Sequence, residues 1–187
     1  MVANPSRRTA VADAALQLLG RDGARAVTHR AVDAEAGVPT GTCANYFGTR
    51  SDLLEGMAQR IFAVLAPDSR RLEELASLDA AEAGPAYAGY VVERLLARPV
   101  LARALIELRL EAARNPEVAE PLGAFLRAGF EADVEFHNSR GLPGGRDAVL
   151  RLHHLVNGIL LDALTIRLDS TADPVAQARN SAAALGS

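Results

Sequence analysis

The sequence predicts an all-α protein. Hydrophobic residues make up 49% of its 187 residues and aromatic residues only 4%. Alanine and leucine dominate; both are strong helix formers, whereas the β-branched residues that favour strands are sparse. Apolar residues recur at three- and four-residue spacing, which is the helical period, and we expect about nine helices. This much apolar surface supports a buried core and argues against disorder.

Capping and chain-breaking residues place the predicted helix boundaries. Thr28 is positioned to cap the second helix, and Gly37 lies where the chain must reverse. Thr49 and Asp52 form a capping box at the start of the fourth helix. Asn115 begins another, with proline at its first helical position. The candidate helices span residues 5–20, 28–35, 39–46, 50–65, 85–97, 99–114, 116 to about 137, 147–168 and 174–185, and residues 68–78 are an additional candidate for a short helix.

Two stretches are predicted to interrupt the helices. Residues 79–85 are interpreted as a break, and residues 139–146, which are rich in glycine, as a flexible loop. Pro39 is expected to preset the backbone at the start of the third helix. We expect two domains, a DNA-binding domain over residues 1–48 and a helical domain over residues 49–187.

Residues 27–50 predict a helix-turn-helix reader of DNA. The second helix of this pair has a small, polar outer face, which can enter a major groove and reach base edges and phosphates. Charge supports this weakly: residues 1–50 hold six arginines against four acids, and the remainder holds fourteen against nineteen. A basic head on an acidic body is typical of a protein that presents one end to DNA. All basic residues except histidine are arginine.

The run T-x-x-x-V-x-x-x-A-G-V-P-x-G-T-x-x-x-Y-F-x-x-R-x-x-L-L, from Thr28 to Leu54, resembles the N-terminal domain of TetR-family (tetracycline-repressor-like) transcriptional regulators. The resemblance covers about residues 7–60. It implies a three-helix head joined by a fourth helix to a C-terminal helical bundle for ligand binding and dimerisation. Two positions depart from the family pattern. Ala44 replaces a usual aromatic residue, and Asp33 replaces a small one, so its carboxylate must point outward or find a donor.

The resemblance assigns DNA contacts to the reader and its flanks. The third helix should reach base edges and phosphates, and the starts of the neighbouring helices should hold phosphates. Phe47, Val32, Val38 and Cys43 are expected to be buried. The candidate DNA-binding residues are Thr28, His29, Arg30, Thr40, Gly41, Thr42, Asn45, Tyr46 and Arg50.

The predicted helix over residues 147–168 is apolar on more than one face. This indicates a two-fold dimer interface, which a reader of palindromic DNA requires; the alternative is a core helix of a monomer. The candidate interface residues are Leu152, Val156, Gly158, Ile159, Leu160 and Ala163.

Aromatic and polar groups on otherwise apolar helices suggest an effector pocket, although each of them could equally be core or surface. They are Tyr87, Tyr90, Arg94, Arg109, Phe125, Phe130, His137 and Asn157.

We expect a cytoplasmic transcriptional regulator that is neither an enzyme nor a metal or cofactor protein. No nucleophile elbow, phosphate loop or zinc motif occurs, and adjacent His153 and His154 point in different directions on a helix. The N-terminus lacks an apolar signal, and no stretch reaches the ~20 apolar residues of a membrane span. The expected partners are an operator in double-stranded DNA, an unknown small-molecule effector and a second copy of the chain. The alternative is an all-α ligand-binding or catalytic protein with a vestigial head.

Overall fold

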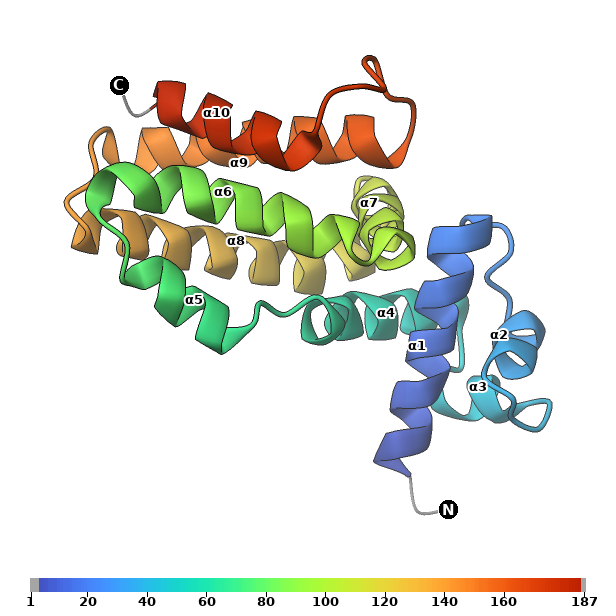
Figure 1. Cartoon of the computed structure of the whole chain (residues 1–187). Coiled ribbons are helices and arrows are strands. Elements are labelled where there is room, and N and C mark those ends of the chain that lie inside the picture. The colour runs from blue at the N-terminus through green and yellow to red at the C-terminus, as the bar shows by residue number, and fades with distance from the viewer. Residues whose placement is uncertain (1–3, 186–187) are drawn as a thin grey trace. The chain divides into compact units, whose positions relative to one another are not determined.

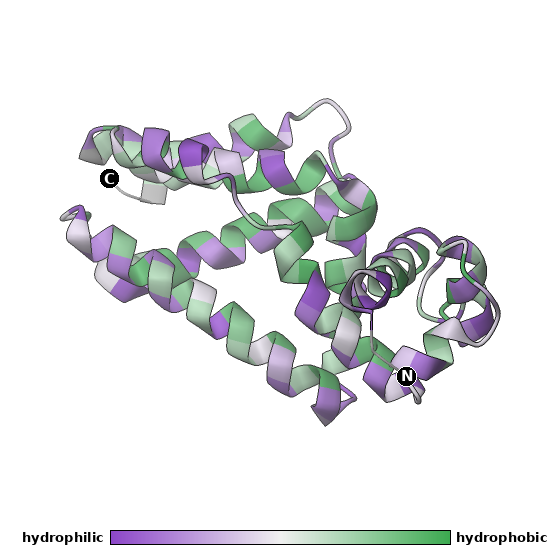
Figure 2. Ribbon diagram, turned by 90° about the horizontal axis from the view of Figure 1, so that it is seen from below, coloured by the Kyte–Doolittle hydropathy of each residue, from purple (hydrophilic) through white to green (hydrophobic). Residues whose placement is uncertain are grey.

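The computed structural model describes residues 4–185, in which ten α-helices and no strand occur (Figure 1). The all-α prediction is confirmed. The helices are α1 (Pro5–Asp22), α2 (His29–Glu35), α3 (Thr42–Tyr46), α4 (Arg50–Val64), α5 (Ser69–Ala76), α6 (Ala80–Leu96), α7 (Pro99–Ala112), α8 (Pro116–Ser139), α9 (Gly145–Leu164) and α10 (Pro174–Leu185). Hydrophilic residues interrupt the hydrophobic ones along the helices (Figure 2). Accordingly, no helix within residues 4–185 has the length and apolar character needed to cross a membrane.

The helices form two compact units. The first unit contains the chain up to Ala66 together with Pro99–Phe125, and the second contains Pro67–Arg98 together with the chain from Leu126 onward. These units are defined by packing. The functional division at residues 48 and 49 stays a prediction.

The first unit is built around α1. The apolar stripe of this helix is buried against α2, α4 and α7, with Val11, Ala15 and Leu16 fully excluded from solvent. Gly20 lets α7 come close, because a Cβ there would lie 1.8 Å from the Val100 carbonyl oxygen. The Arg103 side chain on α7 also donates from Nε to the carbonyl oxygen of Gly20 at 3.0 Å. The stripe predicted over residues 5–20 therefore forms the core of the unit.

The second unit is built around α6, which packs against α5, α9 and α10. Figure 1 shows α10 running beside α6 and α9. Ala83, Ala88 and Val92 of α6 are buried. Gly89 admits the side chain of Arg179 from α10, since a Cβ on Gly89 would lie 2.5 Å from its Nε. Small residues thus allow α6 and α10 to pack closely.

Three predicted boundaries are wrong. α6 runs through the expected break at 79–85, because the Asp79 carboxylate accepts from the backbone N–H groups of Ala81 and Glu82 and starts the helix before Pro85. A proline interrupts only one helical hydrogen bond, which packing of α6 offsets. α3 begins at Thr42 instead of 39, because Gly41 takes a left-handed conformation with φ of 91°. α9 ends at Leu164, four residues before the predicted end.

Candidate functional site

The N-terminus of α3 is capped by a carboxylate from α2. Asp33 accepts hydrogen bonds from the backbone N–H groups of Gly41, at 2.7 Å, and Cys43, at 2.6 Å. Its side chain is buried, with the residue only 2% exposed. The Gly41 cap position offers no side chain of its own, so Asp33 satisfies the free amides and places a negative charge at the favourable end of the helix. Of the two outcomes expected for Asp33, it finds donors.

Other predicted core residues of the head are also inside. Val32, Cys43 and Phe47 are buried and Val38 is half-buried. Burial raises the pKa of the Cys43 thiol to about 11, and the neighbouring Asp33 charge contributes to the rise.

The outer face of the reader is short and polar. Thr40, Ala44 and Asn45 are exposed, whereas Gly41 and Tyr46 are half-buried. Thr40 and Asn45 therefore contribute the exposed polar side chains of this face, beside the small side chain of Ala44.

Thr42 faces inward instead. It is buried, and its hydroxyl donates to the carbonyl oxygen of Pro39 at 2.6 Å, which holds the turn before α3. Thr28 is exposed and caps α2 by accepting the Ala31 N–H at 3.2 Å, and Arg30 beside it is exposed.

Two predicted DNA-binding residues brace the head. Arg50 donates to the backbone carbonyl oxygens of Val27, at 2.7 Å, and Ala24, at 2.8 Å, and so fixes the loop between α1 and α2. His29 donates from Nε2 to the carbonyl oxygen of Phe47 at 2.7 Å. The sequence places both residues at helix starts. It could not show that their side chains already donate hydrogen bonds to backbone carbonyl oxygens of the head.

The Phe47 ring connects α3 to the neighbouring helices. A Cβ on Gly56 of α4 would lie 2.3 Å from its Cε1 atom, so glycine is needed there. The Arg8 guanidinium of α1 lies 4.7 Å from the centre of the ring, which is cation–π distance. Asp13 of α1 and Arg60 of α4 form a further ion pair at 2.7 Å. The reader is thereby attached to two long helices.

In the second unit, polar groups meet around Asp133 of α8. The Tyr87 hydroxyl of α6 donates to its Oδ1 at 2.7 Å, and His153 of α9 donates from Nε2 to its Oδ2 at 2.8 Å. The Phe130 ring stands edge-on to the His153 ring, with the centres 5.3 Å apart. Burial and the Asp133 charge raise the pKa of Tyr87 above its usual range. We call Asp133, Tyr87, His153 and Phe130 the Asp133 cluster.

The fold brings only some of the predicted effector residues close to one another. Tyr87, Tyr90 and Arg94 lie on α6, and the Arg94 guanidinium lies 5.7 Å from the Tyr90 ring. Burial lowers the pKa of Arg94. The Tyr90 hydroxyl accepts the Asp68 N–H at 2.8 Å, which ties it to the start of α5.

The remaining predicted effector residues are dispersed. Asn157 lies one turn from His153 and donates to its carbonyl oxygen at 2.7 Å. Arg109 and Phe125 belong to the first unit, where Phe125 stacks on Phe62 with ring centres 3.5 Å apart. His137 lies near the end of α8, 3.0 Å from the Pro143 carbonyl oxygen. Sequence reasoning missed Asp133, although its three-residue spacing from Phe130 places both on one helix face.

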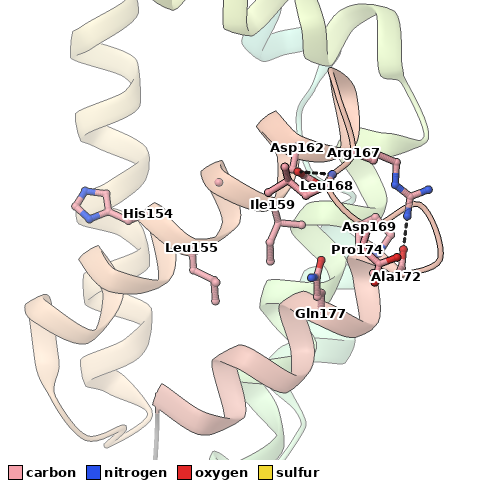
Figure 3. Close-up of a pocket in the computed structure, with 11 residues that line it drawn as sticks. His154, Leu155, Ile159, Asp162, Arg167, Leu168, Asp169, Ala172, Pro174 and Gln177 are labelled. Carbon is pink, nitrogen blue, oxygen red and sulfur yellow. Dashed lines mark hydrogen bonds between the residues drawn. The ribbon is translucent and has the colours of Figure 1, made fainter.

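The outward face of α9 differs from the predicted interface. Val156 and Leu160 are buried within their own chain, and Gly158 is exposed. The predicted residues Leu152, Ile159 and Ala163 are half-buried. The exposed residues Leu150, His154 and Leu161 were not in the predicted set. Beside this face, a cleft of about 370 Å³ lies between α9, α10 and the loop that joins them (Figure 3).

Two family models match the chain. The model described as "Bacterial regulatory proteins, tetR family" matches residues 11–57, and "Tetracyclin repressor-like, C-terminal domain" matches residues 79–186. No curated protein matches the chain.

Similar solved structures cover nearly the whole chain. A member of the TetR family from Streptomyces coelicolor A3 is 25% identical, with a TM-score of 0.72, and covers 98% of this chain and 99% of its own. A transcriptional regulator from Rhodococcus sp. Rha1 is 21% identical, with a TM-score of 0.79 and coverage of 98% and 96%. The multidrug binding protein EbrR complexed with ethidium is 23% identical, with a TM-score of 0.71 and coverage of 97% and 99%.

Proposed function

Because the chain belongs to the TetR family of bacterial transcriptional regulators, we propose that it is a ligand-responsive repressor that binds a palindromic operator as a homodimer. The observation that carries this proposal is the short helix α3, which Asp33 holds in place and which, with the turn before it, presents the exposed polar side chains of Asn45 and Thr40. A helix held in this way can enter a major groove without a further ordering cost.

The reader divides into contact and bracing residues. Thr40, Gly41, Asn45 and Tyr46 are proposed to reach bases and nearby phosphates, and Thr28 and Arg30 the flanking phosphates. His29, Thr42 and Arg50 support the same surface through the carbonyl contacts that fix α3 and the loop before α2. Because alanine stands at position 44 in place of an aromatic residue, Tyr46 and Asn45 are proposed to make most of the contacts to the DNA backbone.

Selection of bound sequences from random DNA tests the operator. A repressor of this kind selects a two-fold symmetric motif with half-sites about 34 Å apart, or a multiple of that distance. Its binding weakens steeply with added salt but keeps a sequence-dependent part. Selection without a symmetric motif, or equal affinity for scrambled DNA, would contradict the proposal.

Single substitutions test α3 and the turn that precedes it. Thr40→Ala and Tyr46→Ala should each weaken operator binding by about 5- to 150-fold, the cost of one base or stacking contact, while the dimer persists. Thr171→Ala, in the exposed loop before α10, is the matched control and should bind as the wild type does. If both variants keep wild-type affinity, α3 and the turn before it are not the reader.

The Asp133 cluster is proposed as part of the effector site, together with Tyr90, Arg94 and Asn157. An effector releases DNA only if it binds the non-repressing state more tightly, and couplings of about 1–3 kcal/mol are typical. Ethidium, which EbrR binds, is a suitable first probe because it is a cation with aromatic rings, and the cluster offers a carboxylate and aromatic rings.

Fluorescence anisotropy of ethidium, measured with the protein and without DNA, gives the affinity. Asp133→Asn should weaken it about tenfold through loss of the charge. Asp147→Asn, at the exposed start of α9, is the control and should leave it unchanged. Equal affinities of the two variants would remove the carboxylate from the site.

A further inference from the structure

The outward face of α9 carries large apolar side chains in water. Leu150 is 43% exposed and Leu161 is 51% exposed, while Ile166 and Leu168, just beyond the helix, are 82% and 94% exposed. Leu150 and Leu161 are separated by about three helical turns and therefore project from the same face of α9. Large exposed apolar side chains that share a face mark interaction sites in folded proteins. Gly158 lies in the middle of the face, and a Cβ built there meets nothing within 4 Å. The face therefore offers an open centre flanked by apolar side chains.

The face is symmetric in character about Gly158. Leu155 and Leu161 lie three residues before and after it, and His154 and Asp162 lie four residues before and after it. An antiparallel copy of the helix, related by a two-fold axis at Gly158, would place each residue opposite its counterpart at equal distance from the axis. Leucine would then face leucine, and the imidazole would face the carboxylate, at two places each.

The cleft beside α9 has room for a side chain from such a copy. It is lined by Leu155, Ile159 and Asp162 of α9 and by Gln177 of α10, among others. Figure 3 shows Leu155 and Ile159 pointing from α9 towards α10, and Gln177 pointing back. Its volume of about 370 Å³ exceeds that of one leucine side chain, and its walls are largely apolar.

We propose that a second copy of this chain docks on α9 with the two-fold axis at Gly158. Leu161 of each protomer enters the cleft of the other against Leu155, and His154 donates to the partner's Asp162. This rests on the homodimer of the proposed function and adds its register. The pairing fixes the register of the two copies, because any shift along α9 separates both imidazole–carboxylate pairs.

Engineered cysteines test the register directly. In the double variant Leu155→Cys/Leu161→Cys, a mild oxidant should convert most of the protein into a disulfide-linked dimer on a non-reducing gel. The two positions are six residues apart, about 9 Å along one helix, which is too far for a disulfide within a chain. The native Cys43 is buried and contributes no background. Each single variant is a control and should remain a monomer on the gel.

A charge exchange tests the paired groups. His154→Asp should weaken dimerisation by at least about 100-fold, because it opposes two carboxylates at two symmetric places. Adding Asp162→Arg should restore the dimer to within about tenfold of the wild type, since a carboxylate and a guanidinium then face each other at both places. Ala132→Asp, on the exposed side of α8, adds the same charge elsewhere and should leave the dimer unchanged. Sedimentation equilibrium measures all four proteins.

The possible results separate this register from the function on which it rests. A dimeric wild type that forms no crosslink, or that shows no rescue by the second substitution, overturns the register alone. A monomeric wild type overturns the register and the homodimer together. Neither measurement contains DNA, so selection of a symmetric operator still decides whether the chain reads DNA.

Discussion

At the scale of single residues, Asp33 makes the hydrogen bonds on which the structure of the head depends most. Its buried carboxylate accepts two short hydrogen bonds from the start of α3. Charged hydrogen bonds of this kind are stronger than neutral ones, and loss of the acceptor would leave the buried amide of Cys43 and the half-buried amide of Gly41 without this partner. The sequence limited the outcomes for this residue to two, but the choice depended on how α2 and α3 pack, which no local pattern records.

Replacement of Asp33 by asparagine should lower the free energy of unfolding by about 2–4 kcal/mol, because the amide can accept at only one of the two positions and brings an N–H group towards a donor. Urea unfolding followed by circular dichroism measures the change. Asp22→Asn is the control, since Asp22 takes part only in an exposed ion pair with Arg21. Equal unfolding midpoints for the two variants would mean that the cap contributes little.

The raised pKa of the Cys43 thiol should make the stability of the fold depend on pH. Its pKa is about 11 in the fold against an ordinary 9.0, so between these values the unfolded chain has lost the thiol proton while the folded chain keeps it. Stability should therefore fall as pH rises through this window. Urea midpoints of the wild type and Cys43→Ala, compared from pH 8 upward, isolate this contribution. A constant difference between the two proteins across that range would contradict it.

At the scale of elements, helix spacing and caps predicted most of the fold. α1 begins at residue 5, as the apolar spacing predicted, and α2 and α4 begin directly after Thr28 and Thr49, which cap them. Errors arose where tertiary packing outweighed a local signal, as in α6, which continues through Pro85. The short α3 was overestimated because its true start depends on Gly41 and on a carboxylate from another helix.

Two glycine-to-alanine substitutions distinguish the effect of side-chain packing on stability from the effect of helix propensity. Gly56→Ala should destabilise the chain by about 1–3 kcal/mol, because the new methyl group would meet the Phe47 ring. Gly129→Ala, in an open stretch of α8, should instead stabilise it by about 0.5–1 kcal/mol through helix propensity. Thermal unfolding of both variants gives the two signs. If Gly56→Ala is also stabilising, the close contact of α4 with Phe47 is relaxed in solution.

At the scale of the whole molecule, the two compact units could not be foreseen. The chain of the first unit is discontinuous, because α7 returns to pack on α1 through Gly20 and Arg103. Similarly, Asp133, Tyr87 and His153 come from three helices far apart in sequence. Sequence spacing identifies which faces are apolar, but it does not state which faces meet, and that is why the effector residues were predicted only in part.

Gly158→Ala should have opposite effects on the protomer and on the dimer. The methyl group finds open space within the protomer and should raise its stability by about 0.5–1 kcal/mol, yet at the proposed axis it should weaken dimerisation about tenfold. Unfolding at low protein concentration and sedimentation equilibrium measure the two effects, with Gly129→Ala as the variant that gains helix propensity without touching α9. Unchanged dimerisation in Gly158→Ala would place the axis elsewhere.

In the proposed repressor, the cap that Asp33 places on α3 also limits how an effector could change binding to the operator. To turn α3 against α2, an effector would have to break two charge-assisted hydrogen bonds to the Asp33 carboxylate, and the His29 bond to the end of α3 as well. Together these cost more than the 1–3 kcal/mol that allosteric coupling usually supplies. The less costly response is displacement of the whole head as one body. Induction would therefore change the spacing of two intact readers and leave the structure of each reader as it is.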